Sequence, residues 1–123
     1  MTELAISNLI LRHFTTSRLN TYDKVACCVL DGSIVGAIGL FWLDGKLCLN
    51  QLCVDTQYRK QGIASRLLAF VSETYQAEQM LYVDKHKPNT NSLLHFYTKR
   101  GFCVVEPQND VEFLLIKAKC CQC

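Results

Sequence analysis

The stretch VDTQYRKQGIASRLLAF, residues Val54 to Phe70, decides how this sequence folds, because it carries the chain from a strand-like segment into an amphipathic helix. Apolar side chains then recur every three to four residues, which is typical of a helix with one buried face, and this pattern ends near Ala77. The expected buried face comprises Ile63, Leu67, Phe70, Val71 and Tyr75. We therefore expect a helix that begins at about Gly62.

The start of this helix has the features of an anion site. The first backbone N–H groups of a helix lack partners within it, and the helix dipole adds partial positive charge there. Gly62 would let a ligand approach the backbone closely, and Ala64 and Ser65 add little bulk. Arg59 and Lys60 supply full positive charges beside it. These residues favour a pyrophosphate ligand, although a solvated helix start with incidental basic residues is an open alternative.

The segment before this helix, from Lys24 to Val54, is expected to form three strands. Two Asp-Gly pairs divide it, Asp31-Gly32 and Asp44-Gly45. Asp-Gly is a strong signal for a two-residue hairpin, because type I′ turns need positive φ at both central residues. The middle strand, SIVGAIGLFWL, is apolar on both faces. It should therefore lie centrally in an antiparallel meander, with helices packed on it.

The chain after the helix should complete the sheet. The short strand QMLYVD, residues 79–84, follows a helical crossover and should pair in parallel with the strand before it. A second helix is expected from an N-cap at Asn91 or Ser92 to the stop residue Gly101. Two last strands, FCVVE and VEFLLIKA, flank a turn at Pro107 to Asp110. The N-terminal segment LAISNLILRHF fits an amphipathic helix.

Length and composition indicate one domain, residues 1–123, because 123 residues with half of them hydrophobic can build one core and hardly two. A net charge of +2 is too small to indicate a nucleic-acid-binding protein. The longest uncharged apolar run, residues 33–43, is about half of the ~20 residues that a membrane-spanning helix needs. The start of the chain has no secretory signal pattern, so we expect a cytoplasmic protein without a membrane partner.

Eight cysteines are many for a chain of this length. The strand-like runs contain Cys27, Cys28, Cys48, Cys53 and Cys103. Free cysteines in such runs are usually small buried hydrophobic residues, and we expect these five in the core. The tail cysteines Cys120, Cys121 and Cys123 could bind a metal or form a disulfide, but they lack paired C-x-x-C spacing and a nearby histidine. We therefore predict no metal site.

The order of these elements resembles the GNAT superfamily of acetyl-CoA-dependent N-acetyltransferases. A strand leads into R-x-x-G-x-A, at Arg59 to Ala64, and the later helix ends in FYTKRGF, which contains Y-x-x-x-G-F at Tyr97 to Phe102. The resemblance covers roughly Val25 to Ile116. It implies an α/β (α+β) fold with a central mixed, mostly antiparallel sheet and flanking helices. A Rossmann nucleotide fold fits less well, because no G-x-G-x-x-G follows the first strand.

The resemblance also implies residue roles. The strands before and after the first helix would splay apart, and the pantetheine arm of acetyl-CoA would lie between them. The backbone of Leu52 would stabilise the oxyanion of a tetrahedral intermediate, Val54 would hold the pantetheine, and Tyr97 would protonate the leaving thiolate. The pyrophosphate would bind to the run Arg59, Lys60, Gln61, Gly62, Ile63, Ala64 and Ser65. Asn91 would add a contact to the coenzyme.

The sequence departs from the family pattern at three places. The strand KLCLNQLCV has no carboxylate to act as general base, so Asp84, His86 or a water-mediated route would take this role. Seven residues before the tyrosine, where many members have asparagine, this chain has Thr90 between two asparagines. Twenty residues before the first strand are hardly enough for the strand and two helices with which members commonly begin. We therefore expect a trimmed N-terminus and a partner subunit, as in a homodimer, over the uncovered surface.

The leading functional hypothesis is transfer of acetyl from acetyl-CoA to a primary amine, in a small molecule or a peptide, by direct attack in a ternary complex. An alternative is a catalytically inactive acyl-CoA-binding module, which the missing carboxylate would permit, and only turnover separates the two. A zinc or redox protein built on the tail cysteines is a third hypothesis. The carboxylates Glu106, Asp110 and Glu112 could attract a cationic acceptor or could be solvated turn residues.

Overall fold

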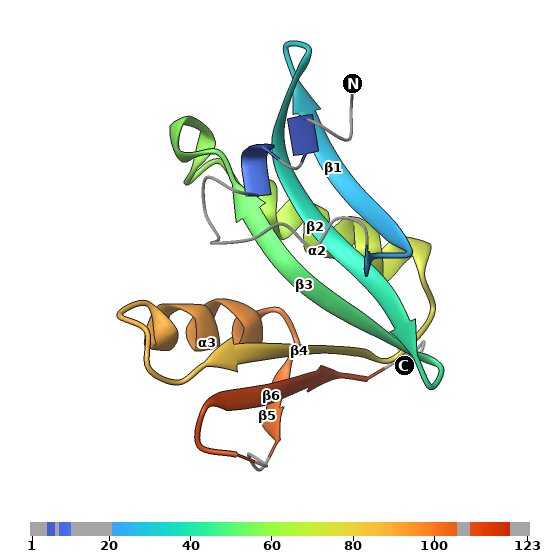
Figure 1. The fold of residues 1–123 in the computed structure, drawn as a ribbon, viewed down its shortest axis with the longest axis vertical. Helices are drawn as coiled ribbons and strands as arrows, with labels where there is room; N and C mark the ends of the chain where they lie inside the picture. The colour runs from blue at the N-terminus through green and yellow to red at the C-terminus, as the bar shows by residue number, and fades with distance from the viewer. Residues whose placement is uncertain (1–4, 7, 11–20, 106–108, 119–123) are drawn as a thin grey trace.

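A computed structural model describes residues 5–6, 8–10, 21–105 and 109–118. Its first three strands are β1 (Lys24–Leu30), β2 (Ser33–Leu43) and β3 (Lys46–Val54). They form the expected antiparallel meander (Figure 1). Both connecting turns have positive φ at their two central residues, 50° and 78° at Asp31-Gly32 and 52° and 78° at Asp44-Gly45. The type I′ hairpins expected from the two Asp-Gly pairs are therefore confirmed.

The remaining strands extend the sheet on the side of β3. These strands are β4 (Gln79–Asp84), β5 (Cys103–Val105) and β6 (Glu112–Lys117). The strand order is β1-β2-β3-β4-β6-β5, and among these described strands only β3 and β4 pair in parallel. The mixed, mostly antiparallel sheet is therefore confirmed. The turn expected at Pro107 begins outside the described residues.

Two helical segments cover opposite faces of the meander (Figure 1). Helix α2 (Ile63–Thr74) packs on one face, and the helical residues 5–6 and 8–10 lie on the other. Buried Leu9 and Ile10 contact a small cluster that includes Ala37 of β2. The central strand is consequently buried on both sides from Val35 to Leu40, as its apolar sequence predicts. None of the described helices combines the length and the apolar character needed to cross a membrane.

The boundaries of α2 differ from the expectation at one end. The helix begins after its N-cap Gly62, as expected, but it ends at Thr74, and Tyr75 is an extended C-cap residue. Phe70, expected on the buried face, is 52% exposed. The buried side chains include Leu68, so the buried face is rotated away from Phe70, which lies beside the outer edge of β1. Because β1 is an edge strand, no further strand among the described residues lies beside it to cover the side chains at the margin of the buried helix face.

Helix α3 (Thr90–Lys99) begins earlier than expected, because its N-cap is Asn89 rather than Asn91 or Ser92. Buried Thr90 explains the change. Its hydroxyl donates to the backbone carbonyl of Asp84 (2.6 Å) and accepts from the amide of Lys87 (3.1 Å), which ties the first turn of α3 to the end of β4. The stop at Gly101 is confirmed, with φ 99°.

The cysteines are only partly in the core. Cys48 and Cys53 are buried, Cys27 and Cys28 are half-buried, and Cys103 is exposed. The expectation for Cys103 was wrong because β5 is a short edge strand, where the neighbouring Val104 is exposed as well. The three tail cysteines lie outside the described residues. Within the described part of the chain, no group of three or more His, Cys, Asp or Glu side chains could hold a metal ion.

Candidate active site

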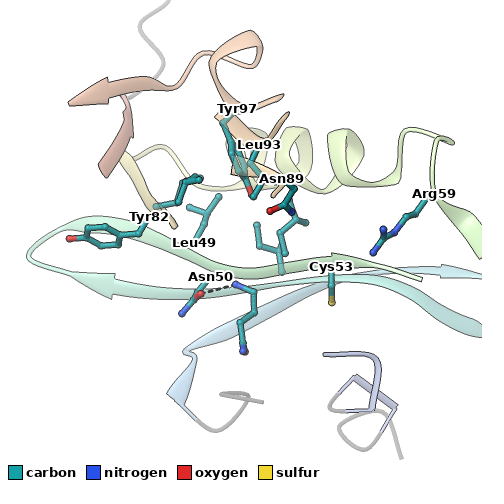
Figure 2. Close-up of a pocket in the computed structure, with 13 residues that line it drawn as sticks. Leu49, Asn50, Cys53, Arg59, Tyr82, Asn89, Leu93 and Tyr97 are labelled. Atoms are coloured by element: carbon teal, nitrogen blue, oxygen red, sulfur yellow. Dashed lines mark hydrogen bonds between the residues drawn. The ribbon is translucent and has the colours of Figure 1, made fainter. Parts of the chain in front are cut away.

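A cavity of about 400 Å³ lies where β3 and β4 part. The two strands pair only at Leu47 with Gln79 and at Cys48 with Met80, although both continue beyond these pairs. The splayed strands expected from the family resemblance are therefore confirmed. The cavity wall is formed by residues 49–53 of β3, residues 81–83 of β4, and single residues of neighbouring elements, among them Arg59, Asn89, Leu93 and Tyr97. In Figure 2, Arg59 and Tyr82 lie at opposite ends of this group of side chains.

A bulge in β3 shapes the cavity wall. On the β2 side, Ala37 pairs with Cys53 and Gly39 pairs with Asn50, so one residue of β2 faces both Gln51 and Leu52. Gln51 has φ 52°, which is unusual for a non-glycine residue inside a strand. The pairing between β3 and β4 has already ended before this point. The backbone of Leu52 therefore belongs to neither strand ladder at the place where it borders the cavity.

The loop between β3 and α2 leads directly to the helix N-terminus. Asp55 accepts a hydrogen bond from the amide of Gln57 (3.1 Å) and caps a short 3₁₀ helix, η2 (Thr56–Tyr58). Lys60 (φ 65°) and Gly62 (φ 78°) then turn the chain into α2. Among the described residues no side chain caps α2, and a Cβ at Gly62 would have open space within 4 Å. In this part of the chain the first-turn amides of α2 therefore have no capping side-chain acceptor, and the helix start follows Arg59 of the cavity wall.

Ser65 has a role that the sequence did not suggest. Its hydroxyl accepts hydrogen bonds from Nε (3.0 Å) and Nη2 (2.5 Å) of Arg100, and the guanidinium lies 3.8 Å from the ring centre of Phe96. The structure uses Arg100 to join the first turn of α2 to the last turn of α3, so that both helices keep their positions beside the cavity.

Tyr97 reaches the cavity from α3. Figure 2 shows its side chain extending from the helix toward β3. The residue is only 8% exposed, and its ring makes edge contacts with Phe96 (5.1 Å between centroids) and Phe102 (5.6 Å). Burial raises the pKa of Tyr97 to about 12, because a phenolate would lose its hydration there. The hydroxyl is therefore a proton donor throughout the neutral pH range.

The two candidate bases lie at the end of β4, outside the cavity lining. The carboxylate of Asp84 accepts a hydrogen bond from the backbone amide of His86 (2.7 Å). Nε2 of His86 lies 2.9 Å from the carbonyl oxygen of Asp110 and must carry its proton to bond there, so Nδ1 is the basic nitrogen. Among the described residues that line the cavity, none is Asp, Glu or His.

The structure thus brings Leu52, Arg59 and Tyr97 together around one cavity. Asn91 does not line the cavity, whereas Asn89 does. Sequence reasoning also missed three polar residues of the wall, Asn50, Gln51 and Tyr82. Asn50 and Gln51 could have been found, because they are the only polar pair in the interior of an otherwise apolar strand, KLCLNQLCV.

Solved structures of similar fold come from several organisms. The PaiA N-acetyltransferase of Thermoplasma acidophilum, in complex with coenzyme A, is 24% identical with a TM-score of 0.67; the match covers 76% of this chain and 59% of that one. Naa50 of Arabidopsis thaliana, bound to the bisubstrate analogue CoA-Ac-MVNAL, is 19% identical (TM-score 0.76; 94% and 91% covered). The aminoglycoside 6′-N-acetyltransferase of Enterococcus faecium is 17% identical (TM-score 0.78; 95% and 90% covered). This chain therefore spans about three fifths of the Thermoplasma protein and most of the other two.

The family assignment depends on the sequence itself. Residues 22–104 match the family model described as the acetyltransferase (GNAT) domain, and these residues include β1 to β4, both complete helices and the cavity wall. The fold agrees with the same assignment, since β3 and β4 part where the resemblance implied it. The chain belongs to the GNAT acetyltransferase family.

Proposed function

We propose that this chain transfers the acetyl group of acetyl-CoA to a primary amine of a small molecule or a peptide, by direct attack within a ternary complex. One observation carries the proposal. The cavity between β3 and β4 has Arg59, three residues before the N-cap Gly62 of α2, at one end and a buried phenol, Tyr97, in its wall. Family membership supports acetyl-CoA as the co-substrate. The N-acetyltransferases of similar fold support an amine acceptor.

The coenzyme would be held through its phosphates and its pantetheine arm. In the proposed complex the pyrophosphate binds to the run from Arg59 to Ser65, mainly through the amides at the start of α2, with Arg59 and Lys60 adding charge. The αL conformation of Gly62 supports this role, because it turns the chain into the helix while leaving open space on that side. The pantetheine would lie along β3 near Val54, where the β4 partner is absent.

The acetyl group would lie beside the bulge in β3. The amine nitrogen attacks the carbonyl carbon of the thioester, and the carbonyl oxygen becomes an oxyanion. The backbone N–H of Leu52, which belongs to neither ladder, would donate to this oxygen; one such donor typically contributes about 3 kcal/mol to the transition state. As the C–S bond breaks, the thiolate takes the proton of the Tyr97 hydroxyl, and the phenolate regains a proton from the acetylated nitrogen, which loses it on becoming the amide. The products are an N-acetyl amine and free coenzyme A.

The acceptor would enter at the end of the cavity opposite Arg59, beside Tyr82 and Asn50 (Figure 2). The attacking amine must be neutral, so a proton has to leave it. We propose that it leaves through water toward Asp84 or His86 at the end of β4. Nδ1 of His86 is the stronger candidate, because Nε2 carries the proton in its bond to the carbonyl of Asp110 and Nδ1 keeps a lone pair that can accept one.

A thiol-release assay with acetyl-CoA tests the proposal. The acceptors would be a peptide with a free N-terminus, a lysine peptide with a blocked N-terminus, spermidine and an aminoglycoside. Release of coenzyme A that depends on one of these amines, with the acetylated amine identified by mass, would support it. Binding of coenzyme A without transfer to any amine would instead support the inactive acyl-CoA-binding module.

A further inference from the structure

Gln51 combines two features that rarely occur together in a strand. Its side chain is buried, with 8% of the residue exposed, and its backbone has φ 52°. At a bulge position with positive φ the usual residue is glycine, because a Cβ is strained there. Asp31 and Asp44 also have positive φ, but both lie in hairpin turns, where this conformation is ordinary. A glutamine in the bulge therefore needs a compensating interaction.

Hydrogen bonds to neighbouring side chains supply this compensation. The hydroxyl of Tyr22 donates to Oε1 of Gln51 (2.7 Å). The side-chain oxygen of Asn50 accepts from the backbone N–H of Gln51 (2.8 Å), as the dashed line in Figure 2 shows. The side chain and the backbone of the strained residue are therefore both held.

The opposite strand is adapted to receive Tyr22. A Cβ at Gly39 would lie only 2.2 Å from the Tyr22 ring, so no residue with a side chain could occupy that position without displacing the ring. The ring also stacks on Phe41, with 6.4 Å between centroids and 13° between planes. Gly39 is the residue of β2 at which the register shift ends. The space for Tyr22 is therefore at the bulge itself.

We propose that Tyr22 is a positioning residue for acetyl transfer: its hydrogen bond to Gln51 fixes the bulge in β3 and thereby fixes the direction of the Leu52 backbone amide at the cavity. This inference rests on the proposed function. Without the bond, Gln51 would be free to relax toward the φ of about −120° to −140° that ordinary strands adopt. That change would rotate the peptide groups of the bulge and turn the amide of Leu52 away from the oxyanion.

The first test is Tyr22→Phe, which keeps the ring, its stacking on Phe41 and its contact with Gly39. We expect kcat to fall by about ten- to a hundredfold, because a misdirected donor loses its effect in the transition state. The KM for acetyl-CoA and the Kd for coenzyme A should change less than about threefold, since the contacts that bind the ground state are retained. Tyr75→Phe is the matched control. That tyrosine contacts Trp42 by its edge, away from the cavity, and its variant should keep the kcat of the unaltered protein.

The second test is Gln51→Leu, in case Tyr22→Phe does not fold. Leucine keeps the Cβ that makes φ 52° strained but offers no side-chain acceptor to Tyr22. We expect kcat to fall as in Tyr22→Phe, and we expect the double variant to lose no more than either single variant, because both changes break one interaction. The thermal unfolding of every variant would be measured alongside kcat.

The outcomes separate this inference from the proposed function. A kcat within twofold of the unaltered protein in Gln51→Leu, or losses that multiply in the double variant, would overturn the role of Tyr22. A raised KM and a lowered melting temperature with kcat retained would overturn it too, because they indicate a general structural role. If the unaltered protein transfers acetyl to none of the amines, the proposed function and this inference both fail.

Discussion

Replacing Tyr97 by phenylalanine tests the chemistry at a single atom. Phenylalanine keeps the ring and its edge contacts with Phe96 and Phe102, and only the hydroxyl is lost. If that hydroxyl protonates the leaving thiolate, kcat should fall by roughly 10² or more, the lower range for removing a positioned general acid. The affinity for coenzyme A should change little, because the acid acts on the transition state rather than on the bound ground state.

The raised pKa of Tyr97 also predicts how the free energy of unfolding changes with pH. Its pKa is about 12 in the folded protein, compared with about 10 in an unfolded chain. The folded state therefore holds this proton more tightly, so the stabilisation is complete below pH 10 and is lost as the pH rises through 12. Two pKa units correspond to roughly 3 kcal/mol of unfolding free energy. Tyr97→Phe has no such titration and serves as the reference.

The assay is chemical denaturation of both proteins from about pH 8 to about pH 12. The difference between their unfolding free energies removes the other groups that titrate in this range. We expect the unaltered protein to lose on the order of 2 kcal/mol relative to Tyr97→Phe by about pH 12. A constant difference over the whole range would refute the buried, neutral phenol. A kcat that is unchanged in Tyr97→Phe would show that the thiolate leaves without its help, and the proton source would then be sought in water or at His86.

Three further expectations concern the coenzyme site and the thiols. Coenzyme A and acetyl-CoA should raise the melting temperature by stabilising the folded state, whereas adenosine should not; no shift at millimolar coenzyme A would contradict the proposed binding site. Gly62→Val should abolish this shift, and Arg59→Ala should only weaken it because the helix amides remain; the reverse order would mean that side-chain charge dominates. In the folded protein an alkylating agent should modify Cys103 while Cys48 and Cys53 stay protected. Mass spectrometry of the digested protein measures this, and rapid modification of Cys48 or Cys53 would contradict their burial.

The elements that sequence could predict are those set by local rules. The two Asp-Gly turns and the doubly apolar strand between them define the meander, because turn type and face pattern depend on neighbouring residues. The start of α2 at Gly62 and the stop of α3 at Gly101 follow from backbone conformations that glycine adopts easily. The splay of β3 and β4 was expected only through the family resemblance, since no spacing in the sequence shows where parallel pairing ends.

The predictions that were wrong share one physical cause. Each depended on residues that are close in the fold but distant in the sequence. The helical period cannot show that Phe70 lies at the rim of a face, since this depends on β1 being an edge strand. Cys103 is exposed for a related reason, because the strand order makes β5 the other edge. The early start of α3 depends on the bond from Thr90 to the carbonyl of Asp84, whose position only the folded sheet defines.

The proposed site lies where these local rules are broken, and the surrounding structure stabilises each departure. The cavity exists because two strands stop pairing after Cys48 and Met80, and the bulge exists because Gln51 adopts a conformation that its side chain disfavours. The bond from Arg100 to Ser65 then links the two helices beside the opening. Apolar side chains of the core would otherwise fill the cavity, so an open and polar cavity requires such support. The residues that provide it are therefore expected to influence turnover even where they touch no substrate.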